Sequence, residues 1–166
     1  FNSKPHNTLE VVRKRLQDFA EKFKKKGKTF NFRLIAGDTK ETLQHPVIID
    51  TPQDEIIIHP SDADLAFIDG GHSDATVQHD YKVLKDVPVI VLDDFIHPLD
   101  NKKEEAEHYL AVNRLCDTFK DKRKWILPSA DPIYLHEEEK LGSTHLVIVI
   151  DDKAEQPPQY LFQVPI

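Results

Sequence analysis

The chain has 166 residues, of which 39% are hydrophobic and 31% are charged, and its formal net charge is −7. This length fits one domain, residues 1–166, with room for a hydrophobic core. The net acidity argues against nonspecific binding to nucleic acid or to an anionic membrane, and no apolar run approaches the roughly 20 residues of a membrane span. A single cysteine, Cys116, excludes a disulfide framework and favours a reducing, cytoplasmic location.

The first predicted elements are a long helix, a strand and a short helix. The chain begins at Phe1 and contains no methionine, which we interpret as a processed or trimmed product of a longer precursor. Apolar residues recur at three- and four-residue spacing over Asn7–Lys26, which indicates an amphipathic helix. The short apolar run Phe32–Ala36 predicts a strand, and a short helix is expected over Thr39–Leu43.

The middle of the chain predicts a hairpin and then two buried strands joined by a helix. Two β-branched runs, Pro46–Asp50 and Glu55–His59, flank a turn that contains proline, which is typical of a hairpin. Continuous apolar runs predict strands at Leu65–Ile68 and Val89–Leu92. A helix that begins at Ser73 and ends near residue 85 connects these two strands.

The last predicted elements complete an α/β pattern. Helical spacing of apolar residues extends over Lys102–Lys120, and two further strands are expected at Trp125–Leu127 and Leu146–Ile150. Short apolar strands that alternate with helices predict an α/β layer structure with a largely parallel sheet.

Carboxylates follow two of the buried strands. Asp69 ends one strand, and Asp93 and Asp94 end the next. Sites in open α/β sheets form at the carboxyl ends of strands, and a single helical crossover would bring these ends side by side. Three converging carboxylates repel one another unless a cation lies between them, and a hard divalent cation such as Mg²⁺ binds such oxygens well. The alternative is that these acids cap the helices that follow them.

His72 lies three residues after Asp69, in a turn that contains two glycines. There it would act as a general base or a metal ligand, or as a histidine that only bonds to the backbone of the turn. His97 is a weaker candidate of the same kind. Asp80, at helical spacing from Ser73, is expected to make a structural hydrogen bond. We interpret Cys116 as a packed, small apolar residue.

These residues carry a resemblance to a known family. The segments Asp64-Leu-Ala-Phe-Ile-Asp69-Gly-Gly-His72-Ser73 and Val89-Ile-Val-Leu-Asp93-Asp94-Phe95, with Asp80 between them, resemble class I S-adenosylmethionine (SAM)-dependent methyltransferases. Within that superfamily the chain is most similar to small-molecule methyltransferases with an Asp-Gly-x-His and an Asp-Asp strand end. The resemblance covers about residues 9–150. It implies a Rossmann-like, doubly wound, mostly parallel sheet.

The resemblance also implies roles for individual residues. In the metal-dependent O-methyltransferase branch, the positions of Asp69, Asp93 and Asp94 hold a divalent cation. That cation would bind two oxygens of a small-molecule substrate, lower the pKa of the attacking hydroxyl and orient it toward the sulfonium methyl. Asp69 and His72 would be catalytic. The SAM-binding residues would be Asp38, Asp69, Gly70 and His72.

One part of the family pattern is missing. The Gly-rich loop that receives the methionine part of SAM and the acid that holds its ribose have no counterpart in the sequence, so about two strand–helix units are absent. We therefore expect no SAM binding by the isolated chain. Loss of those strands would expose the edges at Phe32–Ala36 and Leu65–Ile68. The chain would then stay associated with its missing N-terminal part, close the gap with the hairpin at residues 46–59, or form a homodimer.

Three functional hypotheses follow. The first is a SAM-dependent methyltransferase, assisted by Mg²⁺ or another divalent cation, that acts on a hydroxyl of a small molecule. The second is a degenerate methyltransferase-like domain that binds a partner through its sheet edge and catalyses nothing. The third is a metal-dependent hydrolase or phosphoesterase that uses the same acids together with His72 and His97.

Overall fold

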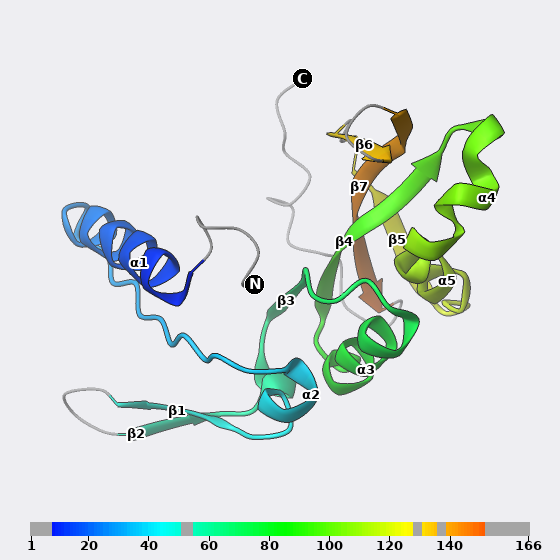
Figure 1. Ribbon diagram of the computed structural model, residues 1–166. Helices are drawn as coiled ribbons and strands as arrows, with labels where there is room; N and C mark the ends of the chain where they lie inside the picture. Colours follow the sequence, from blue (N-terminus) through cyan, green and yellow to red (C-terminus); the bar gives the residue numbers. More distant parts are fainter. Residues whose placement is uncertain (1–7, 51–54, 128–130, 136–138, 152–166) are drawn as a thin grey trace.

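The chain folds as a mixed α/β structure around a five-stranded sheet (Figure 1). A computed structural model describes residues 8–50, 55–127, 131–135 and 139–151, and the structural statements below concern these ranges. In chain order the elements are α1 (Leu9–Lys24), α2 (Thr39–Thr42), β1 (Val47–Asp50), β2 (Glu55–Ile58), η1 (Pro60–Asp62), β3 (Leu65–Ile68), α3 (Asp74–Leu84), β4 (Val89–Pro98), η2 (Asp100–Lys102), α4 (Lys103–Ala106), η3 (Glu107–Tyr109), α5 (Ala111–Asp117), β5 (Lys122–Ile126), β6 (Asp131–Leu135) and β7 (Glu139–Asp151).

The main sheet is mixed rather than largely parallel. Its strands lie in the order β3-β4-β7-β5, and β6 also pairs with β7. Only β3 and β4 are parallel, with Leu65 opposite Val89 and Ile68 opposite Leu92, whereas β7 runs antiparallel to β4, β5 and β6. The expectation of a mostly parallel sheet is therefore wrong for the described strands. Continuous apolar runs are typical of parallel strands because both of their faces are covered, but the antiparallel strands β4 and β7 also have buried side chains on both faces.

The main hydrophobic core lies between one face of this sheet and the helices α3 and α5. Side chains alternate between the two faces of a strand, so every second residue of β3, β4 and β7 points toward these helices. The buried side chains of this core are Ala66, Ile68, Val77, Leu84, Val87, Ile90, Leu92, Ala111, Val112, Leu115, Cys116, Val147 and Val149. A smaller cluster of Val89, Ile148 and Ile150 covers part of the opposite face.

The helix expected over Lys102–Lys120 is broken in the structure. Two short 3-10 turns and two short α-helices replace it, and the chain leaves helical geometry at Leu110, which has φ −87° and ψ 20°. The physical reason is a change of environment along this segment. Glu104 and Glu105 are exposed, whereas Ala111 and Leu115 of α5 are buried against the sheet.

The strand expected at Phe32–Ala36 does not form. This segment pairs with no strand among the described residues, and its aromatic side chain packs toward α1. Phe32 lies beside Phe30, with ring centroids 6.2 Å apart, and Phe30 contacts Phe19 and Phe23 of α1 at 4.9 and 5.7 Å. The helix α1 confirms the first predicted helix, yet no residue of it is fully buried.

The predicted hairpin is confirmed, but it does not extend the main sheet. Strands β1 and β2 pair only with each other in the part of the chain that the structure describes, with Val47 opposite Ile58. The expected closure of the sheet edge by this hairpin is therefore not observed. The outer edge of β3 has no strand partner among the described residues, and Leu65 and Phe67 are 48% and 53% exposed. None of the described helices has the length and apolar character required to cross a bilayer.

Candidate functional site

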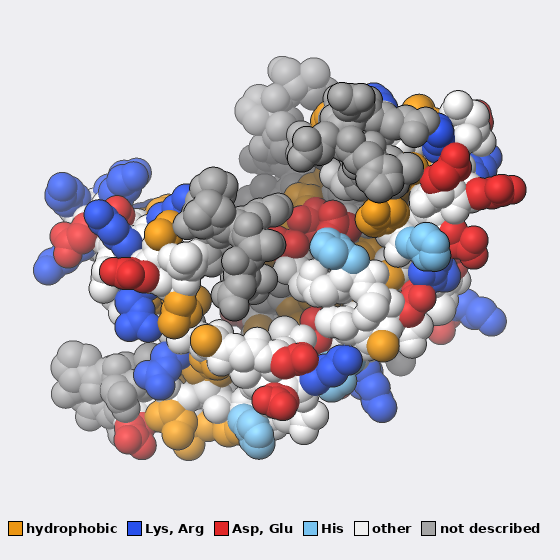
Figure 2. All heavy atoms as spheres, in the orientation of Figure 1, with side chains coloured by type: hydrophobic (Ala, Val, Ile, Leu, Met, Phe, Trp, Pro, Cys, Tyr) orange, Lys and Arg blue, Asp and Glu red, His pale blue; other side chains and the backbone are white. Residues whose placement is uncertain are grey.

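A turn and a strand segment that both carry carboxylates lie side by side where β3 ends. Because β3 and β4 are parallel neighbours, the end of β3 lies level with the middle of β4. The turn after β3 and the Asp-Asp pair of β4 line one pocket, whose residues are Ile68, Asp69, Gly70, Gly71, His72, Val77, Asp93, Asp94, Tyr109, Ala111 and Val112. Figure 2 shows acidic side chains gathered beside a histidine near the centre of this face. The structure thus brings together five residues of the predicted site: Asp69, Gly70, His72, Asp93 and Asp94.

The expectation that Asp93 and Asp94 end their strand is wrong, because β4 continues to Pro98 by pairing with β7; the Asp-Asp pair lies inside β4, at an irregular point. The register with β7 shifts between Leu92 and Phe95, and Asp94 is the one described non-glycine residue with positive φ, at 60°. The carboxylate of Asp93 accepts a hydrogen bond from the backbone N–H of Asp94 at 2.8 Å. A bulge of this kind redirects side chains. Left-handed backbone at a non-glycine residue costs about 1–3 kcal/mol and occurs preferentially at functional sites.

His72 and Asp94 form the central contact of the pocket. The Nδ1 atom of His72 lies 2.8 Å from Oδ2 of Asp94, and the two side chains are 65% and 29% exposed. Desolvation by burial raises the pKa of Asp94, the charge of His72 lowers it, and the charges of Asp93 and Asp69 raise it further. The net pKa shift is upward. The three acids therefore lie close enough to repel one another.

The two glycines of the turn leave room for neighbouring side chains. A Cβ at Gly70 would lie 3.1 Å from Oδ2 of Asp80, and one at Gly71 would lie 3.1 Å from the side chain of Thr76. Asp80 is only 3% exposed, and its Oδ1 accepts no hydrogen bond from the described residues. The structural hydrogen bond expected for Asp80 is therefore not observed at this oxygen.

The donor chemistry of the pocket fits a hard divalent cation. Three carboxylates and an imidazole line it, and their mutual repulsion at Asp94 is the kind that a cation relieves. Within the described ranges, no three His, Cys, Asp or Glu side chains lie in an arrangement that could hold a metal ion. That Asp69 and the Asp93–Asp94 pair share one cation stays a prediction.

The remaining predicted residues lie outside this pocket. Asp38 caps α2, where its Oδ1 accepts a hydrogen bond from the N–H of Lys40 at 2.9 Å. His97 is exposed and lies beside His145, with ring centroids 4.8 Å apart. Cys116 is buried in the core, and burial raises the pKa of its thiol to about 11, which agrees with a packed apolar role.

A larger hollow adjoins the pocket across His72. The pocket itself encloses about 10 Å³, room for about one water molecule, whereas the hollow measures about 600 Å³. The hollow is lined by His72, Ser73, Asp74, Glu107, His108 and Arg114. His72 is therefore placed to face both the acids and a molecule in the hollow.

Sequence reasoning missed the residues that α5 and η3 contribute. Arg114 donates from Nε and from a terminal nitrogen to the two oxygens of Asp74, each at 2.9 Å, and so joins α5 to the first turn of α3. Tyr109 lines the acid pocket itself. Their helical spacing was visible in the sequence, but nothing in it indicated that the helix breaks at Leu110 and turns toward the acids.

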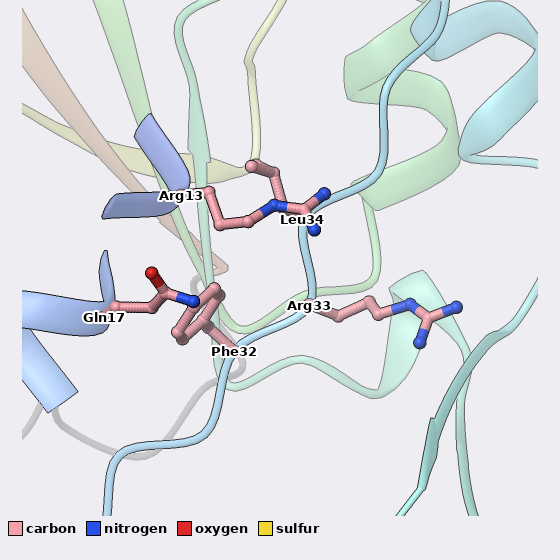
Figure 3. Close-up of a pocket in the computed structure, with 5 residues that line it drawn as sticks. All are labelled: Arg13, Gln17, Phe32, Arg33 and Leu34. Carbon is pink, nitrogen blue, oxygen red and sulfur yellow. The ribbon is translucent and has the colours of Figure 1, made fainter. Parts of the chain in front are cut away.

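A second hollow lies far from the acids, between α1 and the extended segment that follows it (Figure 3). It measures about 420 Å³ and is lined by Arg13, Gln17, Phe32, Arg33 and Leu34. In Figure 3 the side chain of Arg33 points away from Gln17 and Phe32. All five lining side chains are exposed or half-buried, so we assign no chemistry to this hollow.

No protein-family model matches this chain, and neither does any curated protein or any solved structure. Inference about function therefore starts from the residues and the geometry of the acid pocket.

Proposed function

We propose that this chain is part of a class I SAM-dependent methyltransferase that acts on a hydroxyl of a small molecule. The observation that carries the proposal is the convergence of the Asp69-Gly-Gly-His72 turn and the Asp93-Asp94 bulge on one pocket, with His72 and Asp94 in contact at 2.8 Å. These are the two motifs on which the family resemblance depends. The first follows the carboxyl end of β3, the kind of place where α/β enzymes bind their ligands, and the second lies beside it in β4.

The strand order gives further support. Strands β3 and β4 are parallel neighbours in the sheet order β3-β4-β7-β5, and α3 joins them along the chain. The two motifs therefore belong to one strand–helix–strand unit, which is the part of the chain on which the family resemblance depends.

In the proposed reaction, SAM supplies an electrophilic methyl group when it is bound. The acceptor lies in the hollow beside His72, and His72 takes the proton of its hydroxyl through Nε2, because Nδ1 is engaged by Asp94. Asp94 fixes the orientation of the imidazole through this contact. Asp69, Asp93 and Asp94 would hold a divalent cation, which would lower the pKa of the acceptor hydroxyl.

The metal part of the proposal is tested by calorimetry with Mn²⁺ and Mg²⁺ on this chain and on Asp93→Asn. We expect saturable heat with the wild type and a loss of affinity of tenfold or more in the variant, since one charged ligand becomes neutral. Asp38→Asn is the matched control, because Asp38 lies outside the pocket. Equal heats in wild type and Asp93→Asn, or no heat in either, would contradict the metal site.

The transfer reaction is tested with radiolabelled SAM and a panel of small hydroxyl compounds, with the full translation product that contains this chain. We expect transfer that His72→Ala reduces by about 10²–10⁴-fold, the usual contribution of a general base. The isolated 166-residue chain should show no saturable SAM binding. Micromolar binding of SAM by that chain would mean that the SAM-binding residues are misassigned.

One observation favours the second hypothesis, a non-catalytic binding module. The free edge of β3 and the exposed side chains of Leu65 and Phe67 offer a surface for another polypeptide. Absence of methyl transfer, combined with unchanged metal binding in His72→Ala, would favour this module. Hydrolysis of phosphoesters without SAM would favour the metal-dependent hydrolase instead.

A further inference from the structure

The bulge that carries the acids is held on one side by a single side chain of α5. Strand β3 ends at Ile68, opposite Leu92, so β4 has no strand neighbour on that side beyond this point among the described residues. There the side-chain amide of Asn113 makes the backbone hydrogen bonds that a neighbouring strand would otherwise make. Its Oδ1 accepts from the N–H of Ile96 at 3.0 Å, and its Nδ2 donates to the C=O of Ile96 at 2.8 Å.

This contact fixes the backbone two residues after Asp94. A non-glycine residue in left-handed backbone persists only where its surroundings hold it. On the β7 side, regular pairing resumes at Phe95 opposite His145. On the other side, the two hydrogen bonds of Asn113 satisfy both polar groups of Ile96. The bulge is therefore held from both sides, and Asp94 with φ 60° lies immediately before the held segment.

The next residue of α5, Arg114, contacts the start of α3 next to the turn that carries His72. Arg114 makes two hydrogen bonds to Asp74, the first residue of α3, and a third to the backbone oxygen of Glu107 at 3.0 Å. Asp74 follows His72 by two residues. Consecutive residues of one helix thus hold the turn that carries His72 and the bulge that carries Asp94.

We infer that Asn113 is a positioning residue: it touches no substrate but holds the backbone conformation that aims the carboxylate of Asp94 toward His72. The expected effect on cation binding rests on the proposed function. The expected effect on the backbone conformation of Asp94 is independent of that function. Loss of a hydrogen bond that orients a metal ligand typically lowers metal affinity by about 10–100-fold.

The test uses isotope-labelled wild type, Asn113→Ala and Asn113→Asp. The three-bond coupling between the amide and α protons of Asp94 reports its φ. We expect a left-handed value in the wild type and an extended value in Asn113→Ala. Asn113→Asp keeps the acceptor for the N–H of Ile96 and loses the donor to its C=O, so it should fall between them, and it serves as the folded variant if Asn113→Ala is too unstable.

Mn²⁺ affinity gives the second readout. We expect Asn113→Ala to weaken Mn²⁺ binding about tenfold, while Leu84→Val, a core change at the far end of α3, lowers Tm without weakening Mn²⁺ binding. A left-handed Asp94 with unchanged affinity in Asn113→Ala would overturn the inference. If wild type binds no Mn²⁺, the metal part of the proposed function fails, and the coupling of Asp94 alone decides the role of Asn113.

Discussion

Residues 65–151 and residues 8–58 differ sharply in how their side chains are packed. Every buried hydrophobic residue of the described chain belongs to the first region, whereas none belongs to the second. The N-terminal region instead exposes large apolar side chains, namely Leu9, Phe19, Ile35, Ile48, Ile56 and Ile57. In Figure 1, α1 and the β1–β2 hairpin extend away from the sheet that the helices α3 and α5 cover.

The difference shows where a precise site can be built. Catalytic geometry requires side chains that the surrounding packing holds in place. The acid pocket lies entirely in the packed region, between a parallel strand pair and the helices α3 and α5. The hollow between α1 and residues 32–34 has no buried lining residue. We therefore expect perturbation of the two regions to have different consequences for stability and for the site.

The largest effect should come from removing a core side chain. Leu92 is 0% exposed and Leu9 is 45% exposed. Leu92→Ala removes buried methyl groups and leaves a cavity, so we expect a loss of about 2–5 kcal/mol in the free energy of unfolding. Leu9→Ala should change that energy by less than about 0.5 kcal/mol. Urea denaturation measures both, and similar losses in the two variants would show that α1 is part of the same core.

A smaller difference in stability is expected between alanine substitutions at two glycines. A Cβ at Gly142 of β7 would overlap the backbone of His97 on the paired strand, so Gly142→Ala should cost about 3 kcal/mol through strand displacement. Gly27 follows α1 with φ 68° and has nothing within 4 Å of an added Cβ, so Gly27→Ala should cost only about 1 kcal/mol of backbone strain. Thermal unfolding of both variants compares them. A greater loss for Gly27→Ala would contradict the packing of β7 on β4.

The packed region was also the more predictable one. The strands expected at Leu65–Ile68, Val89–Leu92 and Leu146–Ile150 are all present, and each contributes buried side chains to the core. The meeting of Asp69 with Asp93 and Asp94 followed from the crossover geometry alone. In the N-terminal region, by contrast, Phe32–Ala36 has the composition of a strand but no partner to pair with, and a strand is defined by its partner.

Other features depend on tertiary context that no local pattern encodes. The direction of β7 is set by its pairing with β4 and β5, and the left-handed backbone of Asp94 is set by the contacts on either side of the bulge. Asn113 has helical spacing like its neighbours, yet its role depends on β3 ending opposite Leu92 while β4 continues to Pro98. Sequence therefore located the acids but not the residues that hold them.

The last prediction concerns the reactivity of the Cys116 thiol, which reports local opening of the core without a change in the core itself. Only the thiolate reacts with disulfide reagents, and burial raises the pKa of Cys116 to about 11, so at pH 8 its thiolate fraction is about 10⁻³. The residue is also 2% exposed. We expect Cys116 to react only after unfolding, and a cysteine introduced by Leu9→Cys to react within the mixing time of a manual assay. The Leu9→Cys variant thus carries one fast and one slow thiol, and urea should convert the slow one to fast. Rapid reaction of Cys116 in the native wild type would show that the core between α5 and the sheet opens readily, and that the two regions are held with similar stability.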